Sequence, residues 1–185
     1  RVDGCELRAR VIGEGGNLGF TRKARKEAAA RGVRLNADFI DNSGGVDLSD
    51  HEVNLKILLS LPAQSGALKI DDRNVLLEKL AHEICDFVLK NNTTQALGLS
   101  VNQEKCYQNY FTLESFAKQL AKLPPSPCNV FLPDIEEIAA MAKSKAPIPH
   151  SELGLLMAWG KMTITETILK LGAQNHCLAQ SIYRN

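Results

Sequence analysis

Two glycine-rich loops, each placed after a short apolar run, constrain the fold of this chain more than any other feature. The first loop, residues 13–19, follows an apolar run at 7–12, and the second, residues 41–47, follows one at 37–40. An alanine-rich, helix-favouring segment at 22–31 separates them. A strand, a crossover helix and a second strand pair in parallel with a right-handed crossover. We therefore predict adjacent parallel strands at 7–12 and 37–40, with both loops opening on one crevice at the strand ends.

The remainder of the chain is predicted to be helical. Ser49 and Glu52 match the S-x-x-E capping box, which predicts a helix that begins at Ser49 and ends before Pro62. Apolar residues lie on nearly every face of this helix, so we expect the helix to be buried. Later helices are predicted at 71–92, over most of 93–122 with Thr112 as a cap, and at 134–143, 150–171 and 173–183, with a proline-rich connector at 123–133.

Charge and cysteine content exclude several classes of protein. The net charge of +1 argues against a dedicated nucleic-acid surface. No apolar run approaches the roughly 18 residues of a membrane span, and no signal peptide is recognisable. The five cysteines form no C-x-x-C pair, so we expect free, mostly buried thiols in a reducing cytoplasm rather than a zinc site or disulfides. The basic cluster is predicted to be a solvated helix face: Arg22, Lys23, Arg25 and Lys26.

The first loop approaches two phosphate-binding patterns and satisfies neither. Leu18 occupies the third glycine position of G-x-G-x-x-G, and Phe20 occupies the position of the P-loop lysine. Asn17 and Asn42 follow the two apolar runs and can each donate to and accept from a ribose or an amide. The structural alternative is that asparagine simply tolerates the left-handed conformation of a turn. Spacing alone leaves both explanations open.

Two further residues have a structural explanation beside a functional one. Capping alone would be enough to explain Ser49. A helix N-terminus also attracts carboxylates, however, so capping and carboxylate binding are compatible. His51 beside Glu52 does not form H-E-x-x-H, and a packing or surface role is expected. The residues favour a ligand crevice with a helical cap. The alternative is a non-catalytic helical interaction or scaffold domain that carries a partial βαβ unit.

Several stretches resemble the glutamate dehydrogenase superfamily, and most closely its large bacterial NAD-specific members. These stretches are Glu-Gly-Gly-Asn at 14–17, Ala-Asp-Phe-Ile-Asp-Asn-Ser-Gly-Gly-Val at 37–46 and Ser-Asp-His-Glu-Val at 49–53. Two later segments, Leu-Pro-Asp-Ile-Glu-Glu-Ile at 132–138 and Ser-Glu-Leu at 151–153, resemble the helical C-terminal region of that class. The resemblance therefore extends over nearly the whole chain.

This resemblance implies an α/β fold: the last βαβ part of a Rossmann-like parallel sheet, followed by a mainly α-helical region. Residues 1–61 would complete a dinucleotide-binding domain, and residues 62–185 would form a helical C-terminal domain. The implied reaction is oxidative deamination of L-glutamate to 2-oxoglutarate and ammonia, with NAD as the cofactor. The implied cofactor-binding positions are Gly15, Gly16, Asn17 and Asn42. The implied substrate-binding position is Ser49, near a substrate carboxylate, and no metal is implied.

The chain also departs from the family pattern. Leu18-Gly19 stands where the small hexameric members have a proline, and Asp50-His51 replaces their aromatic residue. The catalytic lysines and aspartate of the family would lie upstream of Arg1, so no catalytic residue is expected here. Since one βαβ unit does not make a stable parallel sheet alone, we expect a piece of a longer cytoplasmic protein, inactive alone. Its expected partners are upstream domains, other copies in a homo-oligomer, and L-glutamate or 2-oxoglutarate, but neither nucleic acid nor membrane.

Overall fold

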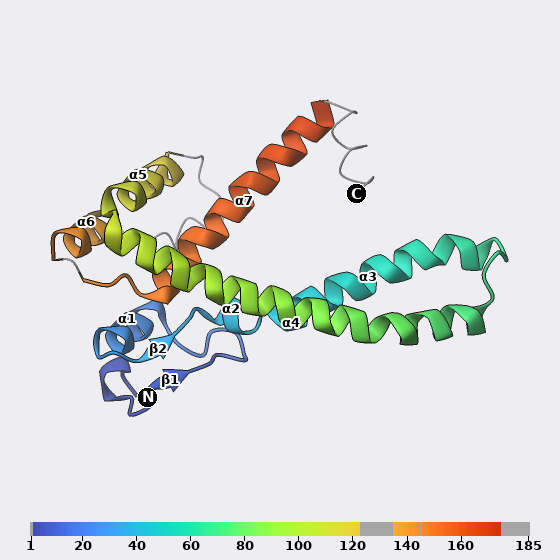
Figure 1. The fold of residues 1–185 in the computed structure, drawn as a ribbon, viewed down its shortest axis with the longest axis horizontal. Helices are drawn as coiled ribbons and strands as arrows, with labels where there is room; N and C mark the ends of the chain where they lie inside the picture. Colours follow the sequence, from blue (N-terminus) through green and yellow to red (C-terminus); the bar gives the residue numbers. More distant parts are fainter. Residues whose placement is uncertain (1, 123–134, 145, 175–185) are drawn as a thin grey trace. The chain divides into compact units, whose positions relative to one another are not determined.

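The computed structural model describes residues 2–122, 135–144 and 146–174, which are mainly helical (Figure 1). The chain divides into two compact units, Arg1–Val101 and Asn102–Asn185. No helix within the described ranges is both long and apolar enough to cross a membrane. The elements, in chain order, are η1 (Gly4–Glu6), β1 (Val11–Ile12), α1 (Arg22–Ala30), β2 (Arg34–Leu35), α2 (Asp38–Asp41), α3 (Ser43–Gln64), α4 (Ile70–Gln108), α5 (Tyr110–Ala121), α6 (Ile135–Ser144) and α7 (His150–Gln174).

The first unit begins with the predicted βαβ arrangement in a short form. β1 and β2 pair in parallel, with Val11 opposite Arg34 and Ile12 opposite Leu35, and α1 connects them. Thr21 caps α1 as predicted, because its hydroxyl accepts from the backbone N–H of Ala24 at 3.2 Å. After α1, Gly32 adopts a φ of +83°, the left-handed conformation that ends helices. Local sequence signals therefore place α1 correctly.

The second strand lies earlier than predicted, and the strand prediction for residues 37–40 is wrong. Residues 38–40 belong to the helical turn α2, which Ala37 precedes as its N-cap, and the N–H of Asn42 donates to the carbonyl oxygen of Asp38 at 2.8 Å. Ala37 and Ile40 are 1% and 2% exposed. Residues three apart share one face of a helical turn, whereas in a strand they point to opposite faces. Helix geometry therefore lets this segment bury both side chains together.

The second glycine loop is also helical, which corrects two predictions. α3 begins at Ser43, so Gly44 and Gly45 lie in its first turn, and Ser49 and Glu52 lie inside the helix rather than at its cap. Two glycines disfavour a helix by about 1 kcal/mol each. Contacts from α4 offset this cost, because Asn92 and Gln95 donate to the Ser43 hydroxyl oxygen at 3.1 and 3.2 Å. Tertiary contacts therefore decide where α3 begins.

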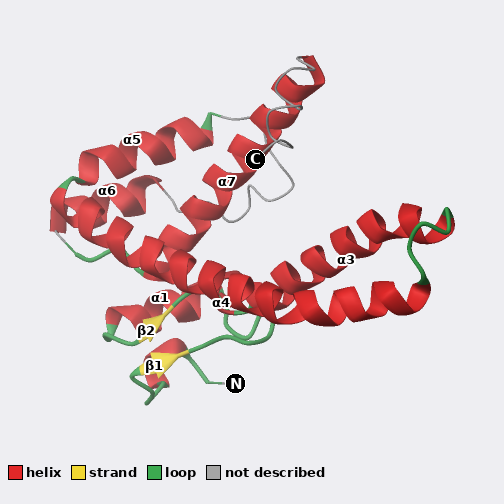
Figure 2. Cartoon of the chain, turned by 45° about the vertical axis from the view of Figure 1, so that its right-hand side comes forward, coloured by secondary structure: helices red, strands yellow, loops and turns green. Residues whose placement is uncertain are grey.

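Helices α3 and α4 lie side by side and run in opposite directions (Figures 1 and 2). Pro62 lies inside α3 rather than after it, and the turn between the helices contains Gly66 with a φ of +77°. The predicted burial of this helix is wrong. No residue of α3 is buried, and its apolar side chains remain 43–71% exposed at Val46, Leu48, Val53, Ile57, Leu58 and Leu61.

The second unit is a helical cluster built from the end of α4, α5, α6 and α7. Leu113, Ile138 and Trp159 are among its buried side chains, at 6%, 3% and 5% exposure. The break predicted at residues 146–149 is confirmed, since Tyr110 and Gln103 donate to the carbonyl oxygens of Ala146 and Ile148 at 2.5 and 2.6 Å. The helix predicted at 134–143 is confirmed over its described residues, from Ile135 onward, and the helix predicted at 150–171 is also confirmed.

Other predictions for this part are wrong or lie outside the described residues. Thr112 does not cap a helix, because α5 already begins at Tyr110. The 123–133 connector and most of the 173–183 helix lie outside the described residues, as do Cys128 and Cys177. The three described cysteines are free, but Cys5 and Cys85 are exposed rather than buried. Cys106 is half-buried, and its burial raises the pKa of its thiol.

Candidate functional site

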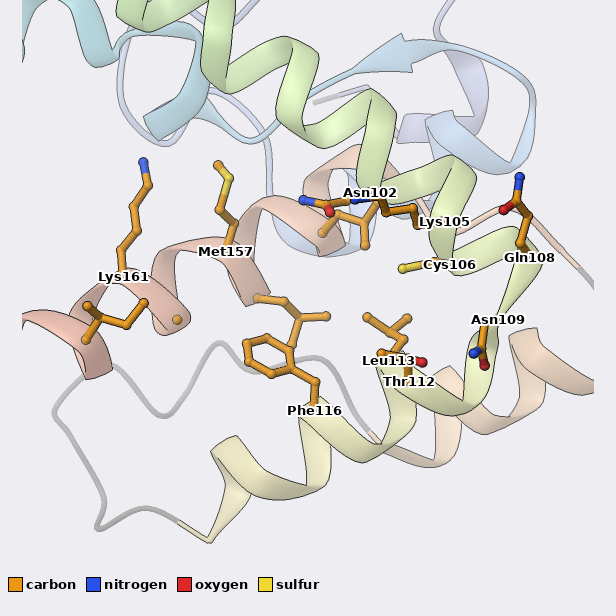
Figure 3. Close-up of a pocket in the computed structure, with 14 residues that line it drawn as sticks. Asn102, Lys105, Cys106, Gln108, Asn109, Thr112, Leu113, Phe116, Met157 and Lys161 are labelled. Carbon is orange, nitrogen blue, oxygen red and sulfur yellow. The ribbon is translucent and has the colours of Figure 1, made fainter. Parts of the chain in front are cut away.

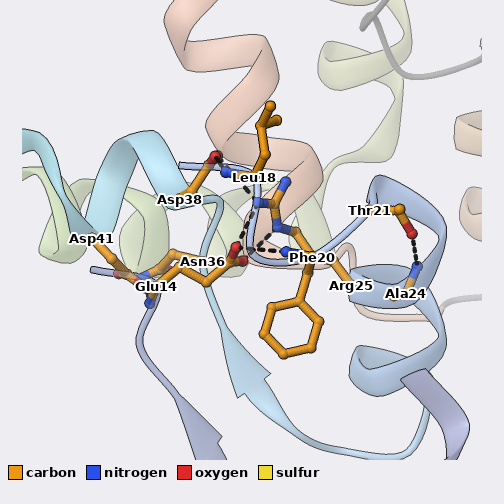
Figure 4. A network of polar contacts seen from close by, with 9 residues as sticks. All are labelled: Glu14, Leu18, Phe20, Thr21, Ala24, Arg25, Asn36, Asp38 and Asp41. Atoms are coloured by element: carbon orange, nitrogen blue, oxygen red, sulfur yellow. Dashed lines mark hydrogen bonds and ion pairs between the residues drawn. The ribbon is translucent and has the colours of Figure 1, made fainter. Parts of the chain in front are cut away.

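A buried ion cluster joins the first glycine loop to α1 and α2 (Figure 4). The Arg25 guanidinium donates from Nε to Glu14 Oε1 at 2.6 Å and from Nη2 to Glu14 Oε2 at 2.8 Å. The same Nη2 lies 3.1 Å from Asp38 Oδ1. Glu14, Arg25 and Asp38 are only 5%, 8% and 7% exposed. The hydrogen bonds that Arg25 donates to Glu14 raise the pKa of Arg25, so the guanidinium keeps its charge although it is buried.

Acidic side chains also accept the backbone amides of the loop. The N–H of Leu18 donates to Asp38 Oδ2 at 2.7 Å, that of Phe20 to Glu14 Oε2 at 3.2 Å, and that of Glu14 to Asp41 Oδ2 at 3.0 Å. A phosphate-binding loop needs free amides and a positive potential. Here carboxylates already hold three amides, which agrees with the failure of both phosphate-binding patterns in the sequence.

The residue of this loop with a positive φ is Leu18, at 59°, and not a glycine. This conformation is uncommon for a residue with a Cβ atom. The hydrogen bond from Leu18 to Asp38 holds it in place, while the leucine side chain is 83% exposed. The bond to Asp38 therefore ties the loop backbone to α2, and the neighbouring Asn17 is exposed.

The two asparagines predicted to bind the cofactor lie together. Asn42 Nδ2 donates to Asn17 Oδ1, although the two residues are 25 positions apart. The acidic residues of the second motif bring them together, because Asp38 and Asp41 hold the first loop by its amides. This hydrogen bond uses one acceptor of Asn17 and one donor of Asn42. The Asn17 amide donors and the Asn42 carbonyl oxygen therefore remain suitable for a ligand with both kinds of group.

The two glycines predicted to bind the cofactor, Gly15 and Gly16, are exposed next to this pair. A Cβ atom added at either position would meet no atom within 4 Å. Packing within the described part of the chain therefore does not require glycine at these positions. By contrast, a Cβ at Gly4 would lie 2.2 Å from the carbonyl oxygen of Ala24, so that glycine is needed for packing against α1.

Ser49, the predicted substrate residue, lies about two turns along α3 from Asn42. Its hydroxyl donates to the carbonyl oxygen of Val46 at 2.7 Å, and the residue is exposed. His51 packs its ring edge against Phe87 at a centroid distance of 5.4 Å, and its Nε2 lies 3.5 Å from Asp47 Oδ1. These contacts agree with the packing role expected for His51. Among the described residues, no cluster of three His, Cys, Asp or Glu side chains could hold a metal ion.

Sequence reasoning missed the residues that hold the loop. The sequence predicts a solvated face for Arg25, yet Arg25 is buried, whereas its neighbour Lys23 fits that prediction with a side chain 86% exposed. The signal in the sequence is the spacing, because Arg25 lies three residues before Ala28 and therefore on the same helix face. The structure shows that this face is buried, with Ala28 fully covered. Glu14 and Asp38 give no comparable local signal, because their partners are distant in the sequence.

Comparison with known proteins identifies relatives for most of the chain. A family model described as "Bacterial NAD-glutamate dehydrogenase, catalytic domain" matches residues 1–102. A protein named NAD-specific glutamate dehydrogenase from Pseudomonas aeruginosa is 42% identical over 173 residues, 92% of this chain. Proteins of the same name from Halomonas elongata and Mycobacterium tuberculosis are 39% and 37% identical over 89% and 91% of the chain. The chain spans only 10–11% of the length of these relatives.

Proposed function

The chain belongs to the bacterial NAD-specific glutamate dehydrogenase family, and we propose that it supplies part of the cofactor and substrate crevice of a larger enzyme. The proposed reaction converts L-glutamate, NAD⁺ and water to 2-oxoglutarate, ammonium, NADH and a proton. In this proposal residues 1–61 complete a Rossmann-like dinucleotide-binding domain, and residues 62–185 form its helical C-terminal domain. The proposed fragment role is supported by the chain's length, about a tenth of that of its relatives.

The hydrogen-bonded pair of Asn17 and Asn42 carries this proposal. NAD presents a carboxamide and ribose hydroxyl groups at its nicotinamide end, and each of these groups both donates and accepts. The free donors of Asn17 and the carbonyl of Asn42 match those groups. The open space at Gly15 and Gly16 would let a flat ring or a ribose approach the backbone closely. The residues present therefore fit the nicotinamide end of the cofactor.

The charge of the loop favours the nicotinamide end over the pyrophosphate. Glu14, Asp38 and Asp41 place three carboxylates near the loop, and Arg25 contacts two of them. A pyrophosphate would be repelled by this excess of negative charge, and three of the loop amides are already bonded. We therefore propose that upstream parts of the enzyme bind the phosphates, and that this loop contacts the uncharged end.

Ser49 is proposed to contact a carboxylate of glutamate. It lies on the same helix as the start of the second motif, its side chain is exposed, and its hydroxyl can rotate to donate to an anion. The proposed role does not require Ser49 to cap a helix, because Ser49 lies inside α3.

The cofactor role predicts a selective effect of removing either asparagine. In the full-length enzyme, Asn17→Ala and Asn42→Ala should each raise KM for NAD about fivefold, since a neutral hydrogen bond contributes about 1 kcal/mol. Asn54→Ala is the matched control, because Asn54 is an exposed asparagine of the same unit. Steady-state kinetics at saturating glutamate provides the measurement. Unchanged NAD kinetics in both variants would remove the pair from the cofactor site.

The fragment role predicts that the 185-residue chain has no dehydrogenase activity and little affinity for NAD. Part of a crevice provides part of the contacts, and these do not exceed the entropic cost of binding. Calorimetry with NAD and an assay for NADH formation would test this expectation. A micromolar dissociation constant for the isolated chain would contradict it, and would show that the chain holds a complete cofactor site.

A further inference from the structure

A cavity of about 650 Å³ lies in the second unit, where the end of α4 meets α5 and α7 (Figure 3). Its size falls in the range of small-molecule sites, which is about 300–1,000 Å³. Most of its lining is apolar, with side chains from α5 and α7: Leu113, Phe116, Leu153, Leu156, Met157 and Ile164. The cavity is therefore built to enclose an apolar group.

Among the described residues, the charged side chains that line the cavity are all of one sign. Lys105 of α4 and Lys161 of α7 line it, and no aspartate or glutamate of the described ranges does so. Asn102, Asn109 and Thr112 add polar groups on the α4 and α5 side. An apolar cavity with positive charge at its wall matches a ligand that is apolar along its length and negatively charged at one end.

We propose that this cavity binds a small amphiphilic carboxylate, with its alkyl chain among the leucines and its carboxylate near Lys105 and Lys161. A carboxylate attached to an alkyl chain leaves the rest of the ligand free of polar groups that the apolar wall could not satisfy. The cavity residues run from Asn102 to Ile164, whereas the catalytic-domain model matches residues 1–102. The proposal therefore concerns binding and does not depend on the proposed dehydrogenase reaction.

Two lining residues make the proposal testable without knowledge of the natural ligand. The thiol of Cys106 points from α4 into the cavity (Figure 3), so a bound ligand would cover it. Gly160 of α7 also lines the cavity, and a Cβ added there would lie 3.3 Å from Cζ of Phe116. A larger side chain at position 160 would therefore occupy the space that the ligand needs.

The first experiment measures alkylation of the 185-residue chain by iodoacetamide, followed at each cysteine by peptide mass spectrometry. Octanoate, octanol and octylamine serve as probes of equal chain length and different charge. We expect saturating octanoate to slow alkylation of Cys106 at least fivefold, with much weaker protection by octanol and octylamine. The exposed Cys5 and Cys85 are internal controls, and their rates should not change. Absence of octanoate protection at millimolar concentration would overturn the proposal.

The second experiment uses variants of the cavity wall, with calorimetry of octanoate binding as the readout. Lys105→Met and Lys161→Met should each weaken binding at least fivefold, and Gly160→Leu should abolish it. Lys143→Met on α6 is the matched control, because Lys143 is exposed and does not line the cavity. Circular dichroism verifies that each variant keeps its helical content. Equal affinity for octanol and octanoate, or equal weakening by the Lys143 variant, would contradict the role of the two lysines.

Discussion

Replacing Arg25 with methionine is expected to lower the free energy of unfolding of the chain by about 3–5 kcal/mol. The guanidinium forms three close contacts with Glu14 and Asp38, and both of these residues are more than nine-tenths buried. Without it, two negative charges would remain buried with no positive partner. The same carboxylates hold the Leu18 and Phe20 amides, so the first glycine loop should lose its conformation as well.

Urea unfolding followed by circular dichroism measures this loss. Lys23→Met, in the same helix, is the matched control. Lys23 is 86% exposed on its side chain and lies 3.6 Å from Glu27, so its removal should change the free energy by less than about 0.5 kcal/mol. Arg25→Lys should recover only part of the stability, because an ammonium group cannot form the two parallel bonds to Glu14.

A triple variant distinguishes the cost of leaving charges buried without a partner from the cost of losing the contacts of Arg25. Glu14→Gln, Arg25→Met and Asp38→Asn together remove every charge of the cluster but keep side-chain oxygens that can accept the loop amides. Since replacing a whole buried ion group is far less costly than breaking it, this variant should recover at least half of the loss. An Arg25→Met variant within about 1 kcal/mol of the parent protein would show that the cluster does not hold the loop.

In the full-length enzyme, Ser49→Asp is expected to raise KM for glutamate at least about tenfold, which is equivalent to 1.4 kcal/mol. If Ser49 meets a substrate carboxylate, a negative charge at this position repels it. NAD affinity should stay near that of the parent enzyme, because the change concerns the substrate alone. Ser49→Ala should leave folding nearly intact, since the residue is exposed and makes a local bond to Val46.

Ser60→Asp provides a close control for this charge. Ser60 lies in the same helix, and its hydroxyl donates to the carbonyl oxygen three residues earlier at 2.7 Å, the same bond that Ser49 makes. It should therefore report any general effect of placing aspartate in α3, with KM for glutamate unchanged. Near-normal glutamate kinetics in a well-folded Ser49→Asp enzyme would remove Ser49 from the substrate site.

The sequence by itself determined the elements that depend on near neighbours. The Thr21 cap, the alanine-rich run and Gly32 set the limits of α1 through bonds that span three or four residues. The strand–helix–strand order was enough to predict a parallel pair, and the motif residues were enough to identify the family. The sequence also singled out Asn17 and Asn42 as a possible pair of ligand contacts, from their positions after two apolar runs.

Only the tertiary structure decided which local conformational preferences the folded chain follows. The glycines at 44 and 45 favour a turn, yet they lie in the first turn of α3, where Asn92 and Gln95 donate to Ser43. Arg25 resembles its solvated neighbours in sequence, yet two distant carboxylates draw it inside. In both cases distant partners outweigh a local propensity of about 1 kcal/mol per residue. Each neutral hydrogen bond to Ser43 contributes about as much as one such propensity. A buried charge without a partner costs several kcal/mol, which decides the position of Arg25.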